Sequence, residues 1–272
     1  MMAAVNGKVL IVAGSDSGGG AGIQADLKTV MALGGYGMTA ITALTAQNTL
    51  GVHGVHPVPP AFVQQQMRVV LDDIGADAVK TGMLGDAALI EAVAEVLRGL
   101  TCPIVIDPVM VAKGGARLLD PAAIGALRTL LPLATVLTPN VPEAEALTGL
   151  TITDEASVSR AIAALLAMGP RAVLLKGGHL PGEIVRDWLG TAGGVRRLDG
   201  PRIDTHHTHG TGCTTASAVA AGLAQGMALP DAVLRARAYV QAAILAAPGY
   251  GQGHGPLGHQ VLPGKVAGWE AV

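Results

Sequence analysis

Short apolar segments alternate with amphipathic segments along most of the chain, and this alternation constrains the fold more than any other feature. Apolar runs rich in β-branched residues are typical of strands that are buried on both faces. Amphipathic segments of ten or more residues between them are typical of helices. A mostly parallel sheet covered by helices on both faces buries both kinds of segment, so the sequence predicts an α/β fold.

The predicted elements follow one another in repeated strand–helix–strand order. Strands are predicted at Val9–Ala13, Met38–Thr45, Ala78–Thr81, Ile104–Asp107, Thr135–Thr138 and Ala172–Lys176. Helices are predicted at Gly22–Leu33, Pro60–Ile74, Asp86–Leu100, Pro121–Leu131, Asp154–Met168, Cys213–Gly226 and Pro230–Ala247. Glu183–Leu189 and Val195–Leu198 flank Gly193-Gly194 and predict a hairpin at one edge of the sheet. After Pro248 the chain is rich in Gly, Pro and His, which predicts a surface tail.

Length and composition indicate one domain, residues 1–272, with this tail from about residue 248. Half of the residues are hydrophobic, only 2% are aromatic, and the formal net charge is −2. No basic patch with interleaved aromatic residues is present, so we expect no nucleic-acid partner. No apolar run reaches the roughly 18 to 20 residues of a membrane span, so we expect no membrane partner and a cytoplasmic protein. We interpret Cys102 and Cys213 as reduced thiols.

The motif His209-Gly210-Thr211-Gly212-Cys213-Thr214 precedes a run of small residues that predicts a helix. Glycines let the backbone approach a ligand closely, and the free N–H groups of a helix N-terminus favour an anion such as a phosphoryl group. The same N-terminus can lower the pKa of a cysteine. The motif therefore indicates an anion site with a reactive thiol. A glycine turn beside a space-filling cysteine is the alternative.

The ends of the six predicted strands carry the unusual polar residues of the chain. Ligands of open α/β sheets bind at the carboxyl ends of the strands, so we expect these residues to converge on one edge of the sheet and to form a catalytic site. The segments are Ser15-Asp16-Ser17 with the glycines that follow, Gln47-Asn48, Lys80-Thr81-Gly82-Met83, Asp107-Pro108-Val109-Met110, Asn140 with Glu143, and Lys176-Gly177-Gly178-His179.

Common nucleotide motifs are absent or incomplete. Gly20–Ala25 matches the loose pattern G-x-G-x-x-A, but no acidic residue follows about 20 positions later to bind a ribose, which argues against a nicotinamide site. The P-loop pattern is missing as well.

Two polar groups have alternative interpretations. Asn140 and Glu143 form a possible helix-capping box, yet Glu143 with Asp107 would also suit a hydrated magnesium ion. The cluster of His206, His207 and His209 lies in a polar loop, and we interpret these side chains as solvated rather than as metal ligands.

Together these motifs resemble the hydroxymethylpyrimidine/phosphomethylpyrimidine kinases of thiamine biosynthesis, which belong to the ribokinase-like superfamily. The resemblance extends from about Val9 to the Gly253-His254-Gly255-Pro256 segment, nearly the whole chain. The segments that carry it are Ala13–Ser17, Gly19–Thr29, Thr42–Thr49, Lys80–Leu84, Asp107–Lys113, Thr138–Asn140 with Glu143, and His209–Thr214.

The resemblance implies a ribokinase-like three-layer sandwich and two successive ATP- and Mg²⁺-dependent phosphorylations, first of the hydroxymethylpyrimidine and then of its monophosphate. By analogy with relatives it also implies a homodimer. The backbone N–H groups of Gly210, Thr211, Gly212 and Cys213 would bind the transferring phosphoryl group. Lys176, together with Thr211 and Gly212, would bind the nucleotide phosphates, and Asp107 and Glu143 would hold Mg²⁺ through water. Gln47, Gly14, Asp16, Met83 and Val109 would form the substrate pocket.

The resemblance assigns Cys213 as the catalytic base, and a thiolate of low pKa would accept the substrate proton. Two alternatives to the predicted function remain: a pyridoxal kinase of the same family, and a non-catalytic nucleotide-binding protein on the same fold. Relatives that use pyridoxal well carry a second cysteine on the loop that contains Val111-Ala112-Lys113. Because alanine stands at the corresponding position 112, we expect a preference for hydroxymethylpyrimidine.

Overall fold

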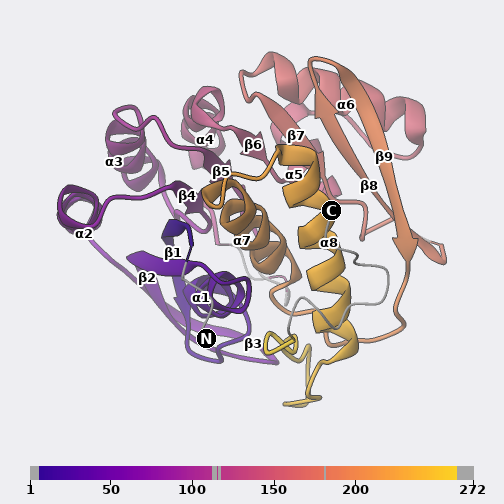
Figure 1. Cartoon of the computed structure of the whole chain (residues 1–272), viewed down its shortest axis with the longest axis horizontal. Helices are drawn as coiled ribbons and strands as arrows, with labels where there is room; N and C mark the ends of the chain where they lie inside the picture. Colours follow the sequence, from indigo (N-terminus) through magenta and orange to yellow (C-terminus); the bar gives the residue numbers. More distant parts are fainter. Residues whose placement is uncertain (1–5, 112–114, 116–117, 181, 262–272) are drawn as a thin grey trace.

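A nine-stranded sheet forms the centre of the computed structural model, which describes residues 6–111, 115, 118–180 and 182–261 (Figure 1). The strand order is β3-β2-β1-β4-β5-β6-β7-β8-β9. The six strands from β2 to β7 in this order run parallel, and β3, β8 and β9 are antiparallel to their neighbours at the two edges. The strands are β1 (Lys8–Asp16), β2 (Tyr36–Asn48), β3 (Gly51–Pro57), β4 (Ala78–Thr81), β5 (Ile104–Ile106), β6 (Val136–Leu137), β7 (Ala172–Leu175), β8 (Ile184–Thr191) and β9 (Gly194–Pro201).

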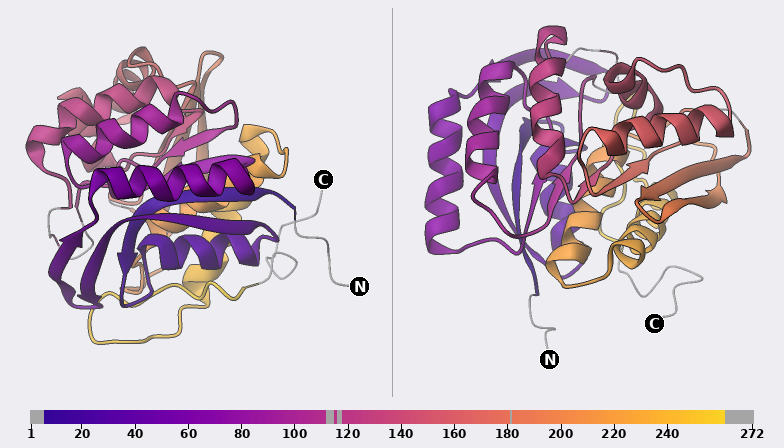
Figure 2. Two further views of the ribbon diagram at one scale, coloured as in Figure 1. Left: turned by 90° about the vertical axis from the view of Figure 1, so that its left-hand side faces the viewer. Right: turned by 90° about the horizontal axis from the view of Figure 1, so that it is seen from above.

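Helices cover both faces of the sheet and make two separate hydrophobic cores. One core lies under α2 (Pro60–Asp73), α3 (Ala87–Leu97), α4 (Ile124–Leu130), α5 (Val141–Thr148) and α6 (Glu155–Ala167). The other lies under α1 (Gly22–Ala32), α7 (Thr211–Ala224) and α8 (Leu229–Leu245), and the two views of Figure 2 show this separation. Two short 3₁₀ turns, η1 (Pro121–Ala123) and η2 (Leu131–Leu133), flank α4. The α/β class and the ribokinase-like three-layer architecture are as predicted.

Small residues let α7 sit in the middle of its layer. Every residue from Thr214 to Gly222 in this helix is buried, so the helix has no solvent-facing side over that length. A Cβ atom at Gly222 would lie 2.7 Å from the Ala232 Cβ of α8, which shows how closely the two helices approach. Burial on all sides fixes the direction of α7, and therefore the place where its N-terminus meets the sheet.

The six predicted strands and the edge hairpin are all present, and two elements were missed. Strand β3 reads Gly-Val-His-Gly-Val-His-Pro, which has little apolar content because the strand is an exposed edge paired only with β2. Helix α5 has eight residues, too few for a clear helical period, although its capping box was visible in the sequence.

The predicted surface tail is exposed from Pro248 to Gln252, but the prediction is wrong for Gly255 and for Leu257–His259, which are buried. The His254 N–H donates to the Thr49 carbonyl at 2.9 Å, and the His209 N–H donates to the Gly255 carbonyl at 3.2 Å. Leu257 and His259 are buried, and His259 Nε2 lies 2.9 Å from Thr214 Oγ1 of α7. The glycines of this segment permit close packing, although the composition indicated an exposed tail.

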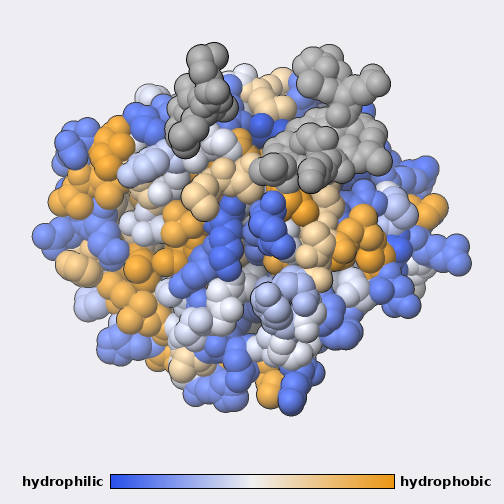
Figure 3. Space-filling model, turned by 60° about the horizontal axis from the view of Figure 1, so that its bottom comes forward, coloured by the Kyte–Doolittle hydropathy of each residue, from blue (hydrophilic) through white to orange (hydrophobic). Residues whose placement is uncertain are grey.

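No helix within the described ranges is both long enough and apolar enough to span a membrane. The face of the molecule drawn in Figure 3 carries hydrophilic and hydrophobic residues side by side, and hydrophilic residues interrupt its apolar groups.

Candidate active site

The carboxyl ends of β1, β2, β4, β5, β6 and β7 lie along one edge of the sheet, because these strands are parallel. This confirms the predicted convergence of the polar segments. The N-termini of α1 and α7 lie at the same edge and complete the candidate site.

Two glycine segments meet at the start of α7. Gly210 is the N-cap of α7 and has φ of +85°, a conformation that favours glycine. A Cβ atom at Gly210 would lie 1.9 Å from the Gly20 carbonyl oxygen, so the loop before α1 touches the N-cap of α7 directly. No other residue type fits at position 210 without moving one of the two loops.

The first turn of α7 presents the backbone donors that were predicted to bind a phosphoryl group. Thr214 is the first residue whose N–H is used within the helix, where it donates to the Gly210 carbonyl at 2.9 Å. The N–H groups of Gly212 and Cys213 precede it and face the helix N-terminus. The Thr211 N–H donates to the Thr208 carbonyl at 3.3 Å, so this N–H already has an acceptor within the protein.

Lys176, Asp107 and α7 converge, as the resemblance implied. Lys176 Nζ donates to Asp107 Oδ1 at 2.9 Å, and Asp107 Oδ1 also accepts from Thr138 Oγ1 at 3.1 Å. A Cβ atom at Gly212 would lie 3.3 Å from Lys176 Nζ and 3.8 Å from Asp107 Oδ2. The absence of a side chain at Gly212 thus leaves the ion pair open to the helix N-terminus.

Glu143 closes the helix-capping box weighed from the sequence, and its role as a magnesium ligand stays a prediction. Its Oε2 accepts from the Asn140 N–H at 2.8 Å and the Asn140 side chain accepts from the Glu143 N–H, so the capping box is confirmed. Glu143 is also buried beside Lys176 and Asp107. Burial raises the pKa of the Glu143 carboxyl to about 7, Lys176 acts against this rise, and Asp107 adds to it.

The two carboxylates fit a magnesium ion that keeps part of its water shell. Mg²⁺ is commonly bound through one or two protein carboxylates, with waters and substrate phosphates completing its octahedron. Like charge between Asp107 and Glu143 raises the pKa of Glu143, and a divalent cation would remove that repulsion. The described residues hold no group of three or more His, Cys, Asp or Glu side chains arranged for a metal ion.

Cys213 lies at the predicted place, but the prediction of a low pKa is wrong. Burial raises the pKa of the Cys213 thiol to about 11, although Lys80 acts to lower it and the Gly22 N–H donates to its sulfur. Asp26 and Asp107 act in the same direction as burial. The helix N-terminus and Lys80 therefore do not overcome desolvation and two nearby carboxylates, and the thiol is protonated at neutral pH.

His209 is buried, which corrects its interpretation as a solvated side chain. Its Nε2 lies 2.9 Å from Asp16 Oδ2 and 3.3 Å from Gln47 Nε2. It thus joins the loop after β1 to the end of β2, next to the N-cap of α7. The alternation of His, Thr and His in the sequence hid this role, because His206 in the same run is exposed.

Asp16 organises the glycine-rich loop before α1. Its carboxylate accepts from the N–H groups of Gly18, Gly20 and Ala21 at 2.8 to 3.1 Å, in addition to its contact with His209. Burial acts to raise the pKa of Asp16, but these hydrogen bonds hold it below its ordinary value. A direct contact with substrate stays a prediction for this residue.

Gln47 is half-buried, and both ends of its carboxamide lie close to protein groups. Thr45 Oγ1 lies 3.1 Å from Gln47 Oε1 and also donates to the Ser15 carbonyl at 2.9 Å. Because a hydroxyl group has one hydrogen, it donates to only one of these acceptors at a time. One lone pair of the amide oxygen and one N–H of Gln47 remain available for a ligand.

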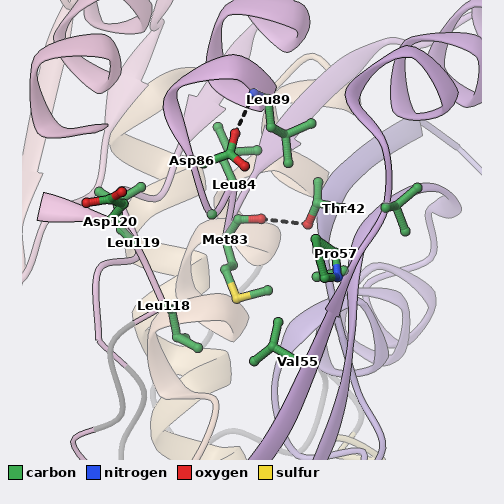
Figure 4. A pocket seen from close by; sticks show the side chains of 13 residues that line it. Thr42, Val55, Pro57, Met83, Leu84, Asp86, Leu89, Leu118, Leu119 and Asp120 are labelled. Atoms are coloured by element: carbon green, nitrogen blue, oxygen red, sulfur yellow. Dashed lines mark hydrogen bonds between the residues drawn. The ribbon is translucent and has the colours of Figure 1, made fainter. Parts of the chain in front are cut away.

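Met83 packs against Gly14 and also lines a cavity. On one side, a Cβ atom at Gly14 would lie 2.4 Å from Met83 Cε, so Gly14 is the residue that admits the methionine methyl group. On the other side lies a cavity of about 320 Å³ that neither Cys213 nor Gln47 lines (Figure 4). Figure 4 shows Met83 pointing between Leu118 and Val55. Val109 is half-buried, and its N–H donates to the Asp107 carbonyl at 2.9 Å.

Lys80 and Asp26 form a fully buried ion pair beneath the site. Both side chains are closed to solvent, and Lys80 Nζ donates to the two Asp26 oxygens at 3.0 and 2.9 Å. The sequence placed Lys80 at the edge of the sheet but did not indicate a partner for it. The expectation that rests on position 112 lies outside the described residues.

The fold and the site together define a small-molecule kinase of the ribokinase-like class. A family model described as phosphomethylpyrimidine kinase matches residues 16–258. The chain belongs to the phosphomethylpyrimidine kinase family.

Named relatives agree with this assignment. The hydroxymethylpyrimidine/phosphomethylpyrimidine kinase of Streptomyces coelicolor is 56% identical over 252 residues, which cover 92% of this chain and 93% of that protein. The thiamine biosynthesis bifunctional protein ThiED of Geobacter sulfurreducens is 55% identical, and the match covers 93% of this chain but only 52% of that longer protein. The structure of a pyridoxal kinase from Staphylococcus aureus in complex with AMP-PCP and pyridoxal superposes with a TM-score of 0.86 at 36% identity, covering 94% of each chain.

The raised pKa of Glu143 predicts a pH-dependent cost in the ligand-free protein. A carboxyl group whose pKa is about 7 when folded and 4.5 when unfolded stabilises the fold at low pH, and this contribution is lost as the pH rises toward 7 and above. Glu143→Gln keeps the acceptor for the Asn140 N–H and has no proton to lose. We expect Glu143→Gln to gain on the order of 1 to 3 kcal/mol relative to the wild type between pH 5 and pH 8.

Urea unfolding without magnesium at pH 5, 6, 7 and 8 measures this difference. Glu145→Gln on the same helix is the matched control and should show no comparable gain. An equal stability difference between Glu143→Gln and the wild type at all four pH values would contradict the raised pKa.

Proposed function

We propose that the protein transfers phosphoryl groups from ATP to 4-amino-5-hydroxymethyl-2-methylpyrimidine and then to its monophosphate, as a step of thiamine biosynthesis. The contact that supports this most is the convergence of Lys176 and Asp107 on Gly212. It joins a cation, a candidate metal-binding carboxylate and free backbone donors at one point. Phosphoryl transfer requires positioning and charge neutralisation more than covalent chemistry, and these are the groups that supply both.

In the proposed reaction the hydroxymethyl oxygen forms a bond to the γ-phosphorus, the bond from that phosphorus to ADP breaks, and the hydroxyl proton leaves. The N–H groups of Gly212 and Cys213 hold the transferring phosphoryl group, and Lys176 neutralises the nucleotide phosphates. Asp107 and Glu143 would hold Mg²⁺ through water, and the bound ion would neutralise phosphate charge. After the first transfer the monophosphate oxygen is the nucleophile of the second, at the same donors.

Gln47 and Met83 are proposed to select the ring. The remaining lone pair and N–H of Gln47 present one acceptor and one donor side by side, which matches the amino group and neighbouring ring nitrogen of an aminopyrimidine. Met83 and Val109 offer apolar surface, and the absence of a side chain at Gly14 leaves room for the Met83 methyl group. His209 Nε2 lies 3.3 Å from the Gln47 amide nitrogen, at the opposite end of the carboxamide from Thr45.

Three further parts of the proposal do not depend on this site geometry. We expect the chain to act as a single domain, to form a homodimer and to reside in the cytoplasm.

Substrate choice tests the proposed function directly. Purified protein is given hydroxymethylpyrimidine and pyridoxal at equal concentration with ATP and Mg²⁺, and the phosphorylated products are measured by mass. We expect the pyrimidine monophosphate and then the diphosphate to dominate, with little pyridoxal phosphate. Dominant pyridoxal phosphate would favour the pyridoxal kinase alternative, and no product beyond background ATP hydrolysis would favour a nucleotide-binding protein without turnover.

Cys213 is proposed as the acceptor of the hydroxyl proton, and its high pKa makes this role testable by pH. With a pKa of about 11, roughly one thiol in ten thousand is ionised at pH 7, and this fraction rises about tenfold per pH unit. Turnover of the wild type should therefore rise steadily with pH. Cys213→Ala keeps the backbone donors and should lose about 10²- to 10⁴-fold in kcat together with the pH-dependent rise.

Cys213→Asp places a carboxylate at the same position and should turn over faster than Cys213→Ala at pH 7. The comparison uses kcat from pH 6 to 10 for the three proteins, with Cys102→Ser as the control thiol variant. If Cys213→Ala retains both near-normal turnover and the rise with pH, the thiol is not the proton acceptor.

A further inference from the structure

The N-termini of α1 and α7 are joined at successive levels, and the lowest level holds a buried pair of charges. At the top, Gly20 touches the N-cap Gly210. In the first turn, the Gly22 N–H donates to the Cys213 sulfur. One helical turn further from the site, Ser217 Oγ of α7 donates to Asp26 Oδ1 of α1 at 2.6 Å.

Asp26 and Ser217 each stand four residues after a residue of the upper contact, Gly22 and Cys213 respectively. Residues four apart lie on the same side of a helix, so the Asp26–Ser217 contact lies about 5 to 6 Å below the Gly22–Cys213 contact. Lys80 reaches this level from β4, and a Cβ atom at Gly82 would lie 3.0 Å from its Nζ. The ammonium group thus lies near the carboxyl end of β4, beside Asp26 in the second turn of α1.

A buried ion pair contributes little net stability to a contact between two helices. Apolar side chains of similar volume often stabilise a protein as well or better, because two charges must be desolvated. Lys80 and Asp26 are both completely buried, and no solvent screens them. Because desolvation opposes the pair, we infer that the positive charge has a role other than stability.

We propose that Lys80 and Asp26 are positioning residues for the anion site: through Ser217 they hold the first turns of α1 and α7 together, and Lys80 sets a fixed positive charge beneath Cys213. This role rests on the proposed kinase function, and it belongs to two residues whose side chains are closed to solvent.

The charges around Cys213 support this assignment. Lys80 from β4 lowers the pKa of the Cys213 thiol, whereas Asp26 from α1 and Asp107 after β5 raise it. Lys176 after β7 also interacts with this thiol. Lys80 has a larger effect on the pKa of Cys213 than Asp26 has, so the pair as a whole favours the thiolate. Although burial acts to lower it, the Asp26 carboxylate keeps the pKa of Lys80 above its ordinary value, so the ammonium stays charged.

Alkylation of Cys213 by iodoacetamide tests the charge without any substrate. The reaction is followed in a Cys102→Ser background at pH 8.5 for the wild type, for the charge-retaining variant Lys80→Arg, and for the charge-free variant Lys80→Met/Asp26→Leu. Lys80→Arg keeps a positive charge that cannot be lost, because a guanidinium does not deprotonate, so Cys213 should react within about twofold of the wild-type rate. The charge-free variant should react more slowly than either, by about threefold or more for each pKa unit gained.

A merely structural role would change both variants in the same direction or not at all, and that result would overturn the proposal. Thermal unfolding of the charge-free variant should show a melting temperature at or above that of the wild type, while its kcat falls tenfold or more. Equal kcat in a stably folded charge-free variant would also overturn it. Lys8→Met is the matched control, because Lys8 Nζ donates to the Ile74 carbonyl at the opposite end of β1.

Ser217→Ala provides a second test if the charge-free variant does not fold. It retains both charges and removes only the link between Asp26 and α7, so kcat should fall while the alkylation rate changes less than twofold. Unchanged kcat in Ser217→Ala would show that the link is not needed. Absence of pyrimidine kinase activity in the wild type would contradict the proposed function and leave the alkylation result as the test of the charge.

Discussion

The contact between the loop before α1 and the N-cap of α7 is the constraint on which the site depends. The Gly20 carbonyl and the Gly210 α-carbon approach so closely that a single methyl group at position 210 would separate them. This approach places two helix N-termini at one edge of a parallel sheet, where the free N–H groups of the first turn favour negative charge. Asp107 after β5, Glu143 in the first turn of α5 and Lys176 after β7 reach the same place.

Burial around this contact has two opposite effects on the chemistry. It strengthens the interaction between Lys176 and Asp107, because few water molecules screen it. It also raises the pKa values of Cys213 and Glu143, so both groups favour their neutral forms in the ligand-free protein. Lys80 acts to lower the pKa of Cys213, and a magnesium ion bound with the nucleotide would add positive charge near Asp107 and Glu143.

Most of the fold could be predicted from the sequence, because alternation of apolar and amphipathic segments directly reflects a buried parallel sheet. The convergence of Asp107, Asn140 and Lys176 followed from the rule that ligands bind at the carboxyl ends of parallel strands. Strand β3 could not be predicted, since an exposed edge strand needs no apolar pattern. The burial of His209 and the packing of Leu257 depend on contacts between segments about 50 to 200 residues apart, as between His209 and Asp16, which no local pattern encodes. The predicted low pKa of Cys213 was wrong for the same reason, because a helix N-terminus can be recognised in the sequence but the desolvation of the thiol cannot.

A structure of the protein with a non-hydrolysable ATP analogue and Mg²⁺ tests the central claim most directly. We expect the γ-phosphate to lie within hydrogen-bond distance of the backbone N–H groups of Gly212 and Cys213. We also expect the metal ion to be bound by Asp107 and Glu143 through water. A γ-phosphate bound away from the first turn of α7, with Gly20 and Gly210 still in contact, would contradict this expectation.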